Sequence, residues 1–376
     1  MPVYLDHNAT TRLDPRVLDA MLPYLSGPYG NASSLHRYGR AARDAVEAAR
    51  AQVAALVGAE AGQVVWTSGG TESNNLALKG VTALAGRSRV LYGATEHPAV
   101  MEAAESLRER GWGVEAIAVD GEGLIDWPAF ARQLAAAPLR LVALMRANNE
   151  TGVIQDLARA APLVHAAGAW LHVDAVQAAG KIPVDFAALG ADLMSLSSHK
   201  IYGPKGIGAL IVSAEVELAP LHHGGAQEKG LRGGTENVAG IVGFGIAAEL
   251  ARQELDARAA QGQALRDRLE AGLRALPSVR IFGDGVARLP NTLQFAVAGY
   301  DGEALLMQLD RKGYAVSSGS ACASGKGEPS HVLIAMGLDR ETAKGAIRVS
   351  LGHENSSDDV DRFLETLRPY ASRQAA

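Results

Sequence analysis

The 376-residue chain is 48% hydrophobic and 20% charged, a composition that supports a large buried core and excludes a disordered protein. Its formal net charge of -5 lacks the basic excess of nucleic-acid-binding proteins, so we expect no nucleic-acid partner. The single cysteine, the absence of an N-terminal export signal and the lack of an apolar run long enough to cross a bilayer predict a protein of the reducing cytoplasm, with no membrane partner.

Helical and strand-like segments alternate through the first half of the chain. The expected strands cover 64–67, 90–92, 114–119, 139–145, 169–173 and 193–196, and the expected helices cover 39–57, 74–85, 98–110 and 156–167. This alternation predicts an α/β fold with a mostly parallel sheet between helices on both faces. Ligands of such sheets bind beyond the carboxyl ends of the strands.

The pattern changes after a long helical region at about 236–276. Strand-like segments follow at 292–297 and 347–351, and helical segments at 301–312 and 357–372. These segments predict a second, smaller α+β domain.

A glycine-rich turn lies between the strand at 64–67 and the following helix. In this segment, Ser68 to Asn74, the backbone N–H groups, the helix N-terminus and the Thr71 hydroxyl are suited to a phosphate group. The segment matches neither the Walker pattern nor the dinucleotide-binding glycine pattern. A glycine turn with a helix cap explains it equally well at this point.

Two polar segments end later strands. Asp174 follows an apolar run and is suited to pairing with the ring nitrogen of a pyridoxal group, although a helix-capping Asp is an equal alternative. Lys200 ends the next run and is suited to forming a Schiff base, with Ser197 and His199 near the phosphate. For an arbitrary lysine, a solvated loop position is the commoner role.

Cys322 lies in a stretch of small and polar residues, 317–327, which is typical of a loop rather than a packed core. A lone cysteine forms no intramolecular disulfide, so its chemistry depends on exposure and thiolate character. The sequence predicts a reactive thiol here, with a small buried hydrophobic side chain as the alternative.

Taken together, the motifs closely resemble those of the cysteine desulfurases, which are pyridoxal-phosphate enzymes of fold type I and belong to the class-V aminotransferases. The resemblance runs nearly end to end, and the short segment after Cys322 is similar to the NifS/IscS group. The matching segments are Tyr4–Thr11, Ser68–Ser73, Thr95–Pro98, Asn148–Gly152, His172–Gln177, Ser197–Lys200, Leu231–Asn237, Ser317–Cys322 and Ile347–Gly352.

The resemblance implies a seven-stranded, mostly parallel sheet in a large domain at 15–259. The small domain would combine 1–14 with 260–376 and carry the cysteine loop at about 317–330. Family sites lie at a dimer interface, so the resemblance also implies a homodimer.

The resemblance assigns the residues around the pyridoxal ring. Lys200 would bind the cofactor covalently and then take the proton from the substrate α-carbon. Asp174 would pair with the ring nitrogen, Gln177 would hydrogen-bond the phenolic oxygen, and His97 would stack on the ring and relay protons. Without the resemblance, a histidine before a proline is more often a capping or turn residue.

The cofactor phosphate would be bound by Gly70, Thr71, Ser197 and His199. Thr235 would join them from the neighbouring subunit of the homodimer. These assignments rest on the resemblance alone.

The remaining assignments concern the substrate. Asn149 would contact cofactor or substrate, and Arg348 would bind the substrate carboxylate through its planar fork, although a surface position on an edge strand is an equal alternative for Arg348. Cys322 would attack the sulfur of cofactor-bound L-cysteine as a thiolate, giving L-alanine and a persulfide on Cys322. The sulfur would pass to an acceptor for iron–sulfur cluster assembly or thiolation.

Three alternatives remain open. A selenocysteine lyase would use the same site, and another fold-type-I enzyme, such as an aminotransferase, would leave Cys322 without a role. A non-catalytic sulfur-relay or scaffold component would keep the fold without turnover. We expect no resident metal, because His222 and His223 are adjacent and no Cys/His cluster has ligand spacing, although Cys322 could transiently contact an iron–sulfur cluster on a partner.

Overall fold

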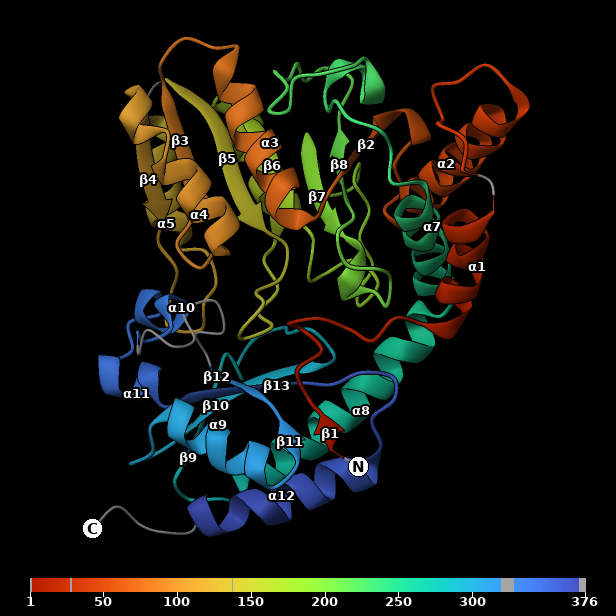
Figure 1. Ribbon diagram of the computed structural model, residues 1–376. Coiled ribbons are helices and arrows are strands. Elements are labelled where there is room, and N and C mark those ends of the chain that lie inside the picture. The colour runs from red at the N-terminus through yellow and green to blue at the C-terminus, as the bar shows by residue number, and fades with distance from the viewer. Residues whose placement is uncertain (1, 28, 137, 319–327, 372–376) are drawn as a thin grey trace.

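A computed structural model describes residues 2–27, 29–136, 138–318 and 328–371. Its largest element is a seven-stranded sheet of order β2-β8-β7-β6-β5-β3-β4, as expected from the sequence (Figure 1). The strands are β2 (Val64–Thr67), β3 (Arg89–Gly93), β4 (Gly113–Ile117), β5 (Leu139–Met145), β6 (Trp170–Asp174), β7 (Leu193–Ser197) and β8 (Gly208–Val212).

Strand β8, which the sequence pattern did not single out, is antiparallel to both of its neighbours. The β3–β4, β3–β5, β5–β6 and β6–β7 pairs are parallel. The parallel strands therefore end at one edge of the sheet, and that edge faces the C-terminal part of the molecule in Figure 1.

Helices cover both faces of this sheet, and each face has its own apolar core. One core joins alternate strand residues such as Val142 and Leu144 to helices on one side, and the other joins Leu141 and Ala143 to α3 and α4. The helices of the large-sheet region are α1 (Pro15–Ser26), α2 (Arg37–Leu56), α3 (Gly70–Ala83), α4 (Pro98–Glu105), α5 (Trp127–Ala135), α6 (Leu157–Ala166) and α7 (Val238–Gln253).

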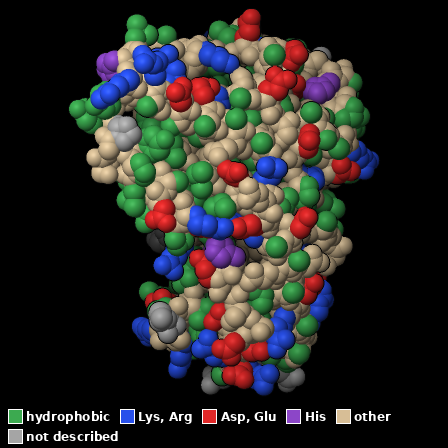
Figure 2. Space-filling model, turned by 90° about the vertical axis from the view of Figure 1, so that its right-hand side faces the viewer, with side chains coloured by type: hydrophobic (Ala, Val, Ile, Leu, Met, Phe, Trp, Pro, Cys, Tyr) green, Lys and Arg blue, Asp and Glu red, His purple; other side chains and the backbone are tan. Residues whose placement is uncertain are grey.

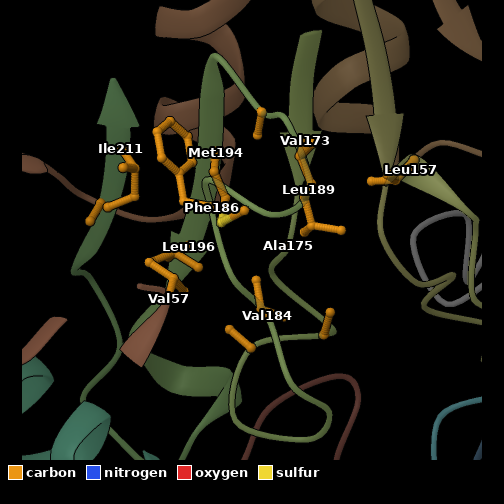
Figure 3. Close-up of a cluster of buried hydrophobic side chains, with 14 of the residues drawn as sticks. Val57, Leu157, Val173, Ala175, Val184, Phe186, Leu189, Met194, Leu196 and Ile211 are labelled. Carbon is orange, nitrogen blue, oxygen red and sulfur yellow. The ribbon is translucent and has the colours of Figure 1, made fainter. Parts of the chain in front are cut away.

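The core beneath β6, β7 and β8 supports β6 and β7, the two strands whose carboxyl ends reach the site. Val173, Leu196, Ile211 and Phe186 belong to this cluster (Figure 3). All of these side chains are buried. Dense packing of this kind leaves little freedom to the strand ends, so polar residues that follow them are held in place.

Local sequence explains several helix boundaries. Helix α2 buries Val46, Ala49 and Val53 on one face and stops before Gly58, whose φ of +63° favours glycine. The helical region expected at about 236–276 is confirmed and consists of two helices, because α7 ends at Gln253 and α8 (Leu255–Arg274) begins two residues later.

A smaller C-terminal domain contains an antiparallel sheet of order β12-β13-β10-β9. Its strands are β9 (Val279–Phe282), β10 (Thr292–Val297), β12 (Ser317–Ser318) and β13 (Ala346–Ser350), and its helices are α8, α9 (Gly302–Arg311), α10 (His331–Ala335), α11 (Arg340–Lys344) and α12 (Ser357–Ala371). Helix α8 runs from the large-sheet region toward this domain (Figure 1). The division at residues 15 and 259 stays a prediction.

The N-terminal segment crosses between the two sheets. Strand β1 (Val3–Tyr4) pairs in parallel with β11 (Tyr314–Ala315), and Asp6 forms a bridge with Ser350 of β13. The next residues therefore lie between the C-terminal domain and the strand ends of the large sheet.

The described residues contain no helix that is long and apolar enough to cross a membrane. On the face shown in Figure 2, acidic and basic side chains are interspersed over much of the surface.

Candidate active site

The predicted cofactor and substrate residues, apart from Thr235, surround one cavity of about 330 Å³. Those that line it are Gly70, Thr71, His97, Asn149, Asp174, Gln177, Ser197, His199, Lys200 and Arg348. A larger hollow of about 630 Å³ beside α2 is lined by charged groups that are already paired, such as Arg50 and Glu228 at 2.8 Å. Chemistry rather than size therefore identifies the smaller cavity as the candidate site.

The turn before α3 forms one wall of the cavity. Gly69 has a φ of +154°, and a Cβ on Gly70 would lie 2.9 Å from the Val176 Cγ2 atom. Helix α3 begins at Gly70 rather than at Asn74, so the exposed Thr71 lies in its first turn. First-turn N–H groups lack intrahelical partners and favour an anion, as a phosphate site requires.

Asp174 ends β6 with both carboxylate oxygens engaged. One oxygen accepts a 2.8 Å hydrogen bond from Asn74 Nδ2, and the other accepts from the Val176 backbone N–H at 2.9 Å. The residue is buried, so its position is well determined. Sequence reasoning did not single out Asn74, whose only signal was its place at the end of the glycine-rich segment.

A second buried carboxyl group lies near Asp174. Burial raises the pKa of Glu96 well above its usual value, and the charge of Asp174 adds to the effect. Glu96 accepts a hydrogen bond from the Met145 backbone. Close to Asp174 the neutral form of Glu96 is therefore favoured, which leaves Asp174 as the better-placed anion for a cationic ring nitrogen.

Lys200 lies on the short 3-10 turn Ser198–Lys200 that follows β7. Its Nζ donates to two backbone carbonyls of the N-terminal segment, Asn8 at 2.5 Å and Ala9 at 2.8 Å. These contacts hold the amine beside the cavity.

His199 is the neighbour of Lys200 on the same turn. Its Nδ1 atom lies 3.1 Å from the Thr10 hydroxyl. Burial, followed by the charge of Lys200, lowers the pKa of His199 to about 4. At pH 7 the neutral form of His199 is therefore favoured, and a neutral imidazole offers one N–H as a hydrogen-bond donor.

His97 caps α4, because its Nδ1 accepts from the Ala99 N–H at 3.1 Å and Pro98 occupies the first helical position. Its pKa is lowered by burial, which Asp174 opposes and Lys200 reinforces. His97 therefore has both roles: it caps α4, as the sequence alone favoured, and it lines the cavity.

Arg348 reaches the cavity from β13 of the C-terminal domain. It is 2% exposed, and it donates to Asp6 at 2.6 Å and to the Asn149 carbonyl at 3.0 Å. Its buried Nε has no hydrogen-bond partner among the described residues. The surface alternative for Arg348 is therefore wrong, and sequence reasoning missed its partner Asp6.

Two predicted residues are not part of this cavity wall. Thr235 is exposed on the loop before α7 and does not line the cavity. Cys322 lies outside the described residues. Within the described ranges, no group of three or more His, Cys, Asp or Glu side chains is arranged to hold a metal ion.

The residues present fit pyridoxal phosphate. The cavity combines a lysine amine, a buried carboxylate with fixed oxygens and a helix N-terminus whose Gly70 leaves room that a Cβ would fill. The amine can form a Schiff base with the cofactor aldehyde, and the carboxylate can pair with the pyridine nitrogen. The helix N-terminus can bind the phosphate.

Comparisons with known proteins agree with this chemistry. The family model described as Aminotransferase class-V matches residues 3–363. A cysteine desulfurase of Gluconacetobacter diazotrophicus is 48% identical, with 97% of this chain and 92% of the relative covered, and the cysteine desulfurase IscS of Anaeromyxobacter dehalogenans is 46% identical, with 96% and 90% covered.

Solved structures give the same result. The NifS-like protein of Rickettsia africae superposes with a TM-score of 0.90 at 36% identity, covering 98% of this chain and 99% of that chain. The cofactor of this family, pyridoxal phosphate, is the one that the cavity fits. The chain belongs to the class-V aminotransferase family and, within it, to the cysteine desulfurases.

Proposed function

We propose that this protein removes sulfur from L-cysteine at the cavity between its two sheets and passes it through Cys322 to an acceptor protein. The observation that carries the proposal is the convergence of Lys200, Asp174, His97 and Arg348 on one cavity from separate elements. The acceptor is an iron–sulfur scaffold or a thiolation protein, and the enzyme acts as a cytoplasmic homodimer.

Pyridoxal phosphate, when bound, supplies an electron sink for cleavage of the substrate bonds. Lys200 moves the proton at the substrate α-carbon, and Asp174 keeps the ring nitrogen protonated. Gln177 hydrogen-bonds the phenolic oxygen of the ring. His97 stacks on the ring and, being neutral, accepts or donates a proton beside it.

The phosphate is held by the first turn of α3, through Gly70 and Thr71, together with Ser197 and His199. Thr235 completes this group from the second subunit. Its exposure and its position away from the cavity of its own chain are consistent with a contribution across a dimer interface.

Arg348 binds the substrate carboxylate, and Asn149 lies beside it. Nη1 of Arg348 donates to the Asn149 carbonyl and Nη2 donates to Asp6, so the plane of the fork is fixed, and each of these nitrogens carries a second N–H for a carboxylate. Cys322, as thiolate, attacks the substrate sulfur, the C–S bond breaks, and a persulfide on Cys322 and L-alanine result.

The test is the stoichiometry of turnover. Purified protein loaded with pyridoxal phosphate is given L-cysteine and a thiol reductant, and sulfide and alanine are measured together. Equal release of both supports the proposal, and alanine without sulfide or a colourless protein refutes it. Cys322→Ala is expected to keep the yellow colour and lose sulfide release, whereas Lys200→Ala is expected to lose the covalent attachment.

Parallel assays with L-selenocysteine distinguish a selenocysteine lyase, which would strongly prefer that substrate. Transfer is followed by labelling the protein with ³⁵S-cysteine and adding an iron–sulfur scaffold protein. Light scattering tests the homodimer, and Thr235→Ala should weaken cofactor binding if the second subunit contributes this hydroxyl.

A further inference from the structure

A second lysine, Lys181, lies behind the cavity. It follows β6 and is not among the cavity-lining residues, but it lines a small adjoining cavity of about 40 Å³ together with Lys200. Its Nζ donates to the Gln177 Oε1 atom at 2.7 Å and to the Asn8 Oδ1 atom at 2.8 Å. Lys181 therefore reaches the site only through other side chains.

Two neighbours of opposite hydrogen-bonding role hold the Gln177 amide. Its Oε1 accepts from the Lys181 amine, and its Nε2 donates to the Asn8 carbonyl at 2.9 Å, which is only an acceptor. Rotating the amide by half a turn would place Oε1 against the Asn8 carbonyl, acceptor against acceptor, and would remove the hydrogen bond in which Lys181 donates to Oε1. Both partners thus require the same amide orientation.

This orientation decides what Gln177 offers to the cavity that it lines. The Oε1 atom is engaged behind the cavity, and one of the two Nε2 hydrogens is used by Asn8. The second Nε2 hydrogen is the donor left to Gln177. With Oε1 turned toward Lys181, this hydrogen favours a ligand that presents an acceptor oxygen.

Asn8 is the other group that Lys181 holds. Its side chain also donates to Thr292 Oγ1 at 2.9 Å and to the Asn149 carbonyl at 3.2 Å. The Asn8 carbonyl in turn accepts from Lys200 and Gln177. Loss of Lys181 would therefore loosen the carbonyl that both site residues share.

The protonation state of Lys181 does not undo this arrangement. Burial, with added repulsion from Lys200 and Arg348, lowers the pKa of Lys181 well below its usual value. A neutral amine still carries two N–H groups, which is the number that Gln177 and Asn8 require.

We propose that Lys181 is a positioning residue that, through its hydrogen bonds to Gln177 and Asn8, fixes the Gln177 amide as a hydrogen-bond donor toward an acceptor oxygen of the bound cofactor. This proposal rests on the role of Gln177 in the proposed function. It makes Lys181 a determinant of cofactor binding although Lys181 does not line the cavity.

A double-mutant cycle tests it. Apoprotein is titrated with pyridoxal phosphate, and the dissociation constant and the absorption spectrum are recorded for the wild type, Lys181→Met, Gln177→Leu and the double variant. Lys181→Met is expected to weaken binding about tenfold, the effect of losing one well-placed hydrogen bond, and to shift the absorption maximum. In the Gln177→Leu background, the same change should add less than about twofold, because its route of action is gone.

Lys312→Met is the matched control, since Lys312 is exposed directly after α9, in the C-terminal domain. It should bind like the wild type and keep its spectrum. Lys181→Arg keeps N–H donors at this position, and a spectrum closer to that of the wild type than the spectrum of Lys181→Met would support positioning. Unfolding midpoints are measured for all variants, and if Lys181→Met does not fold, Lys181→Gln replaces it in the same cycle.

Two results would overturn the role of Lys181 while leaving the proposed function intact. One is wild-type affinity and spectrum in Lys181→Met, and the other is a loss of affinity that adds in full to that of Gln177→Leu. A wild-type protein that binds no pyridoxal phosphate would instead refute the proposed function, and this role of Lys181 with it.

Discussion

Acidification from pH 8 to pH 5 should cost unfolding free energy through His172, and replacing His172 should remove that contribution. His172 lies on β6 two residues before Asp174, is fully buried, and contacts the Ser195 hydroxyl at 2.9 Å. Burial lowers its pKa to about 4, against a partial opposing effect of Asp174. The folded protein therefore keeps His172 neutral at a pH where the unfolded chain protonates it.

The sign and size follow from proton linkage. Between a pKa of about 4 in the folded state and an ordinary value of 6.5, the unfolded state binds more protons, so stability falls as the pH falls. For this one residue the expected loss of unfolding free energy between pH 8 and pH 5 is about 2 kcal/mol. Most of the loss develops below pH 6.5.

Guanidinium unfolding of the wild type and His172→Gln at pH 8, 6.5 and 5 measures this loss. The difference in slope between the two proteins isolates His172, because other titrating groups are common to both. Glu96 and Glu150, whose pKa values burial raises, act in the opposite direction in both proteins. Parallel pH profiles for the two proteins would refute the assignment of a buried, neutral His172.

Three further substitutions test the site. Gly208→Ala should lower the unfolding midpoint and weaken cofactor binding, because a Cβ there would lie 2.6 Å from the Gly69 Cα. Overpacking of this kind costs about 1–3 kcal/mol. An unchanged midpoint in calorimetry would contradict this prediction. Asp174→Asn should reduce kcat at least about 100-fold with an unchanged far-ultraviolet spectrum, and undiminished kcat would remove the charge of Asp174 from the reaction. Arg348→Lys should raise KM for L-cysteine by a factor about tenfold larger than the factor by which it lowers kcat, because lysine cannot make a forked contact with a carboxylate. Steady-state kinetics with an unaltered KM would exclude carboxylate binding by Arg348.

The sheet was readable from the sequence because its strands are buried on both faces. Val64–Thr67 and Leu193–Ser197, for example, are continuous buried runs, and such runs between helical segments indicate a parallel sheet. Strand β8 departs from this rule, since it follows β7 without an intervening long helix and runs antiparallel. Alternation of strands and helices therefore predicted its neighbours and not β8 itself.

The candidate site divides in the same way. Lys200 and Asp174 were predictable because polar residues directly after buried strands lie at one sheet edge. Asn8 and Lys181 carried no comparable signal, since neither lies directly after a predicted strand and their importance depends on what they contact. The predicted place of Thr235 in the site requires a second subunit and stays a prediction.

The sequence by itself determined the fold class, the family and the residues suited to pyridoxal-phosphate chemistry, because these depend on local periodicity and on motifs in a given order. Tertiary structure alone decided how those residues are held: Gln177 by Asn8 across 169 positions, and Arg348 by Asp6 across 342. Contacts at such separations leave no periodic trace in the chain. They form only when the N-terminal segment is packed between the two sheets.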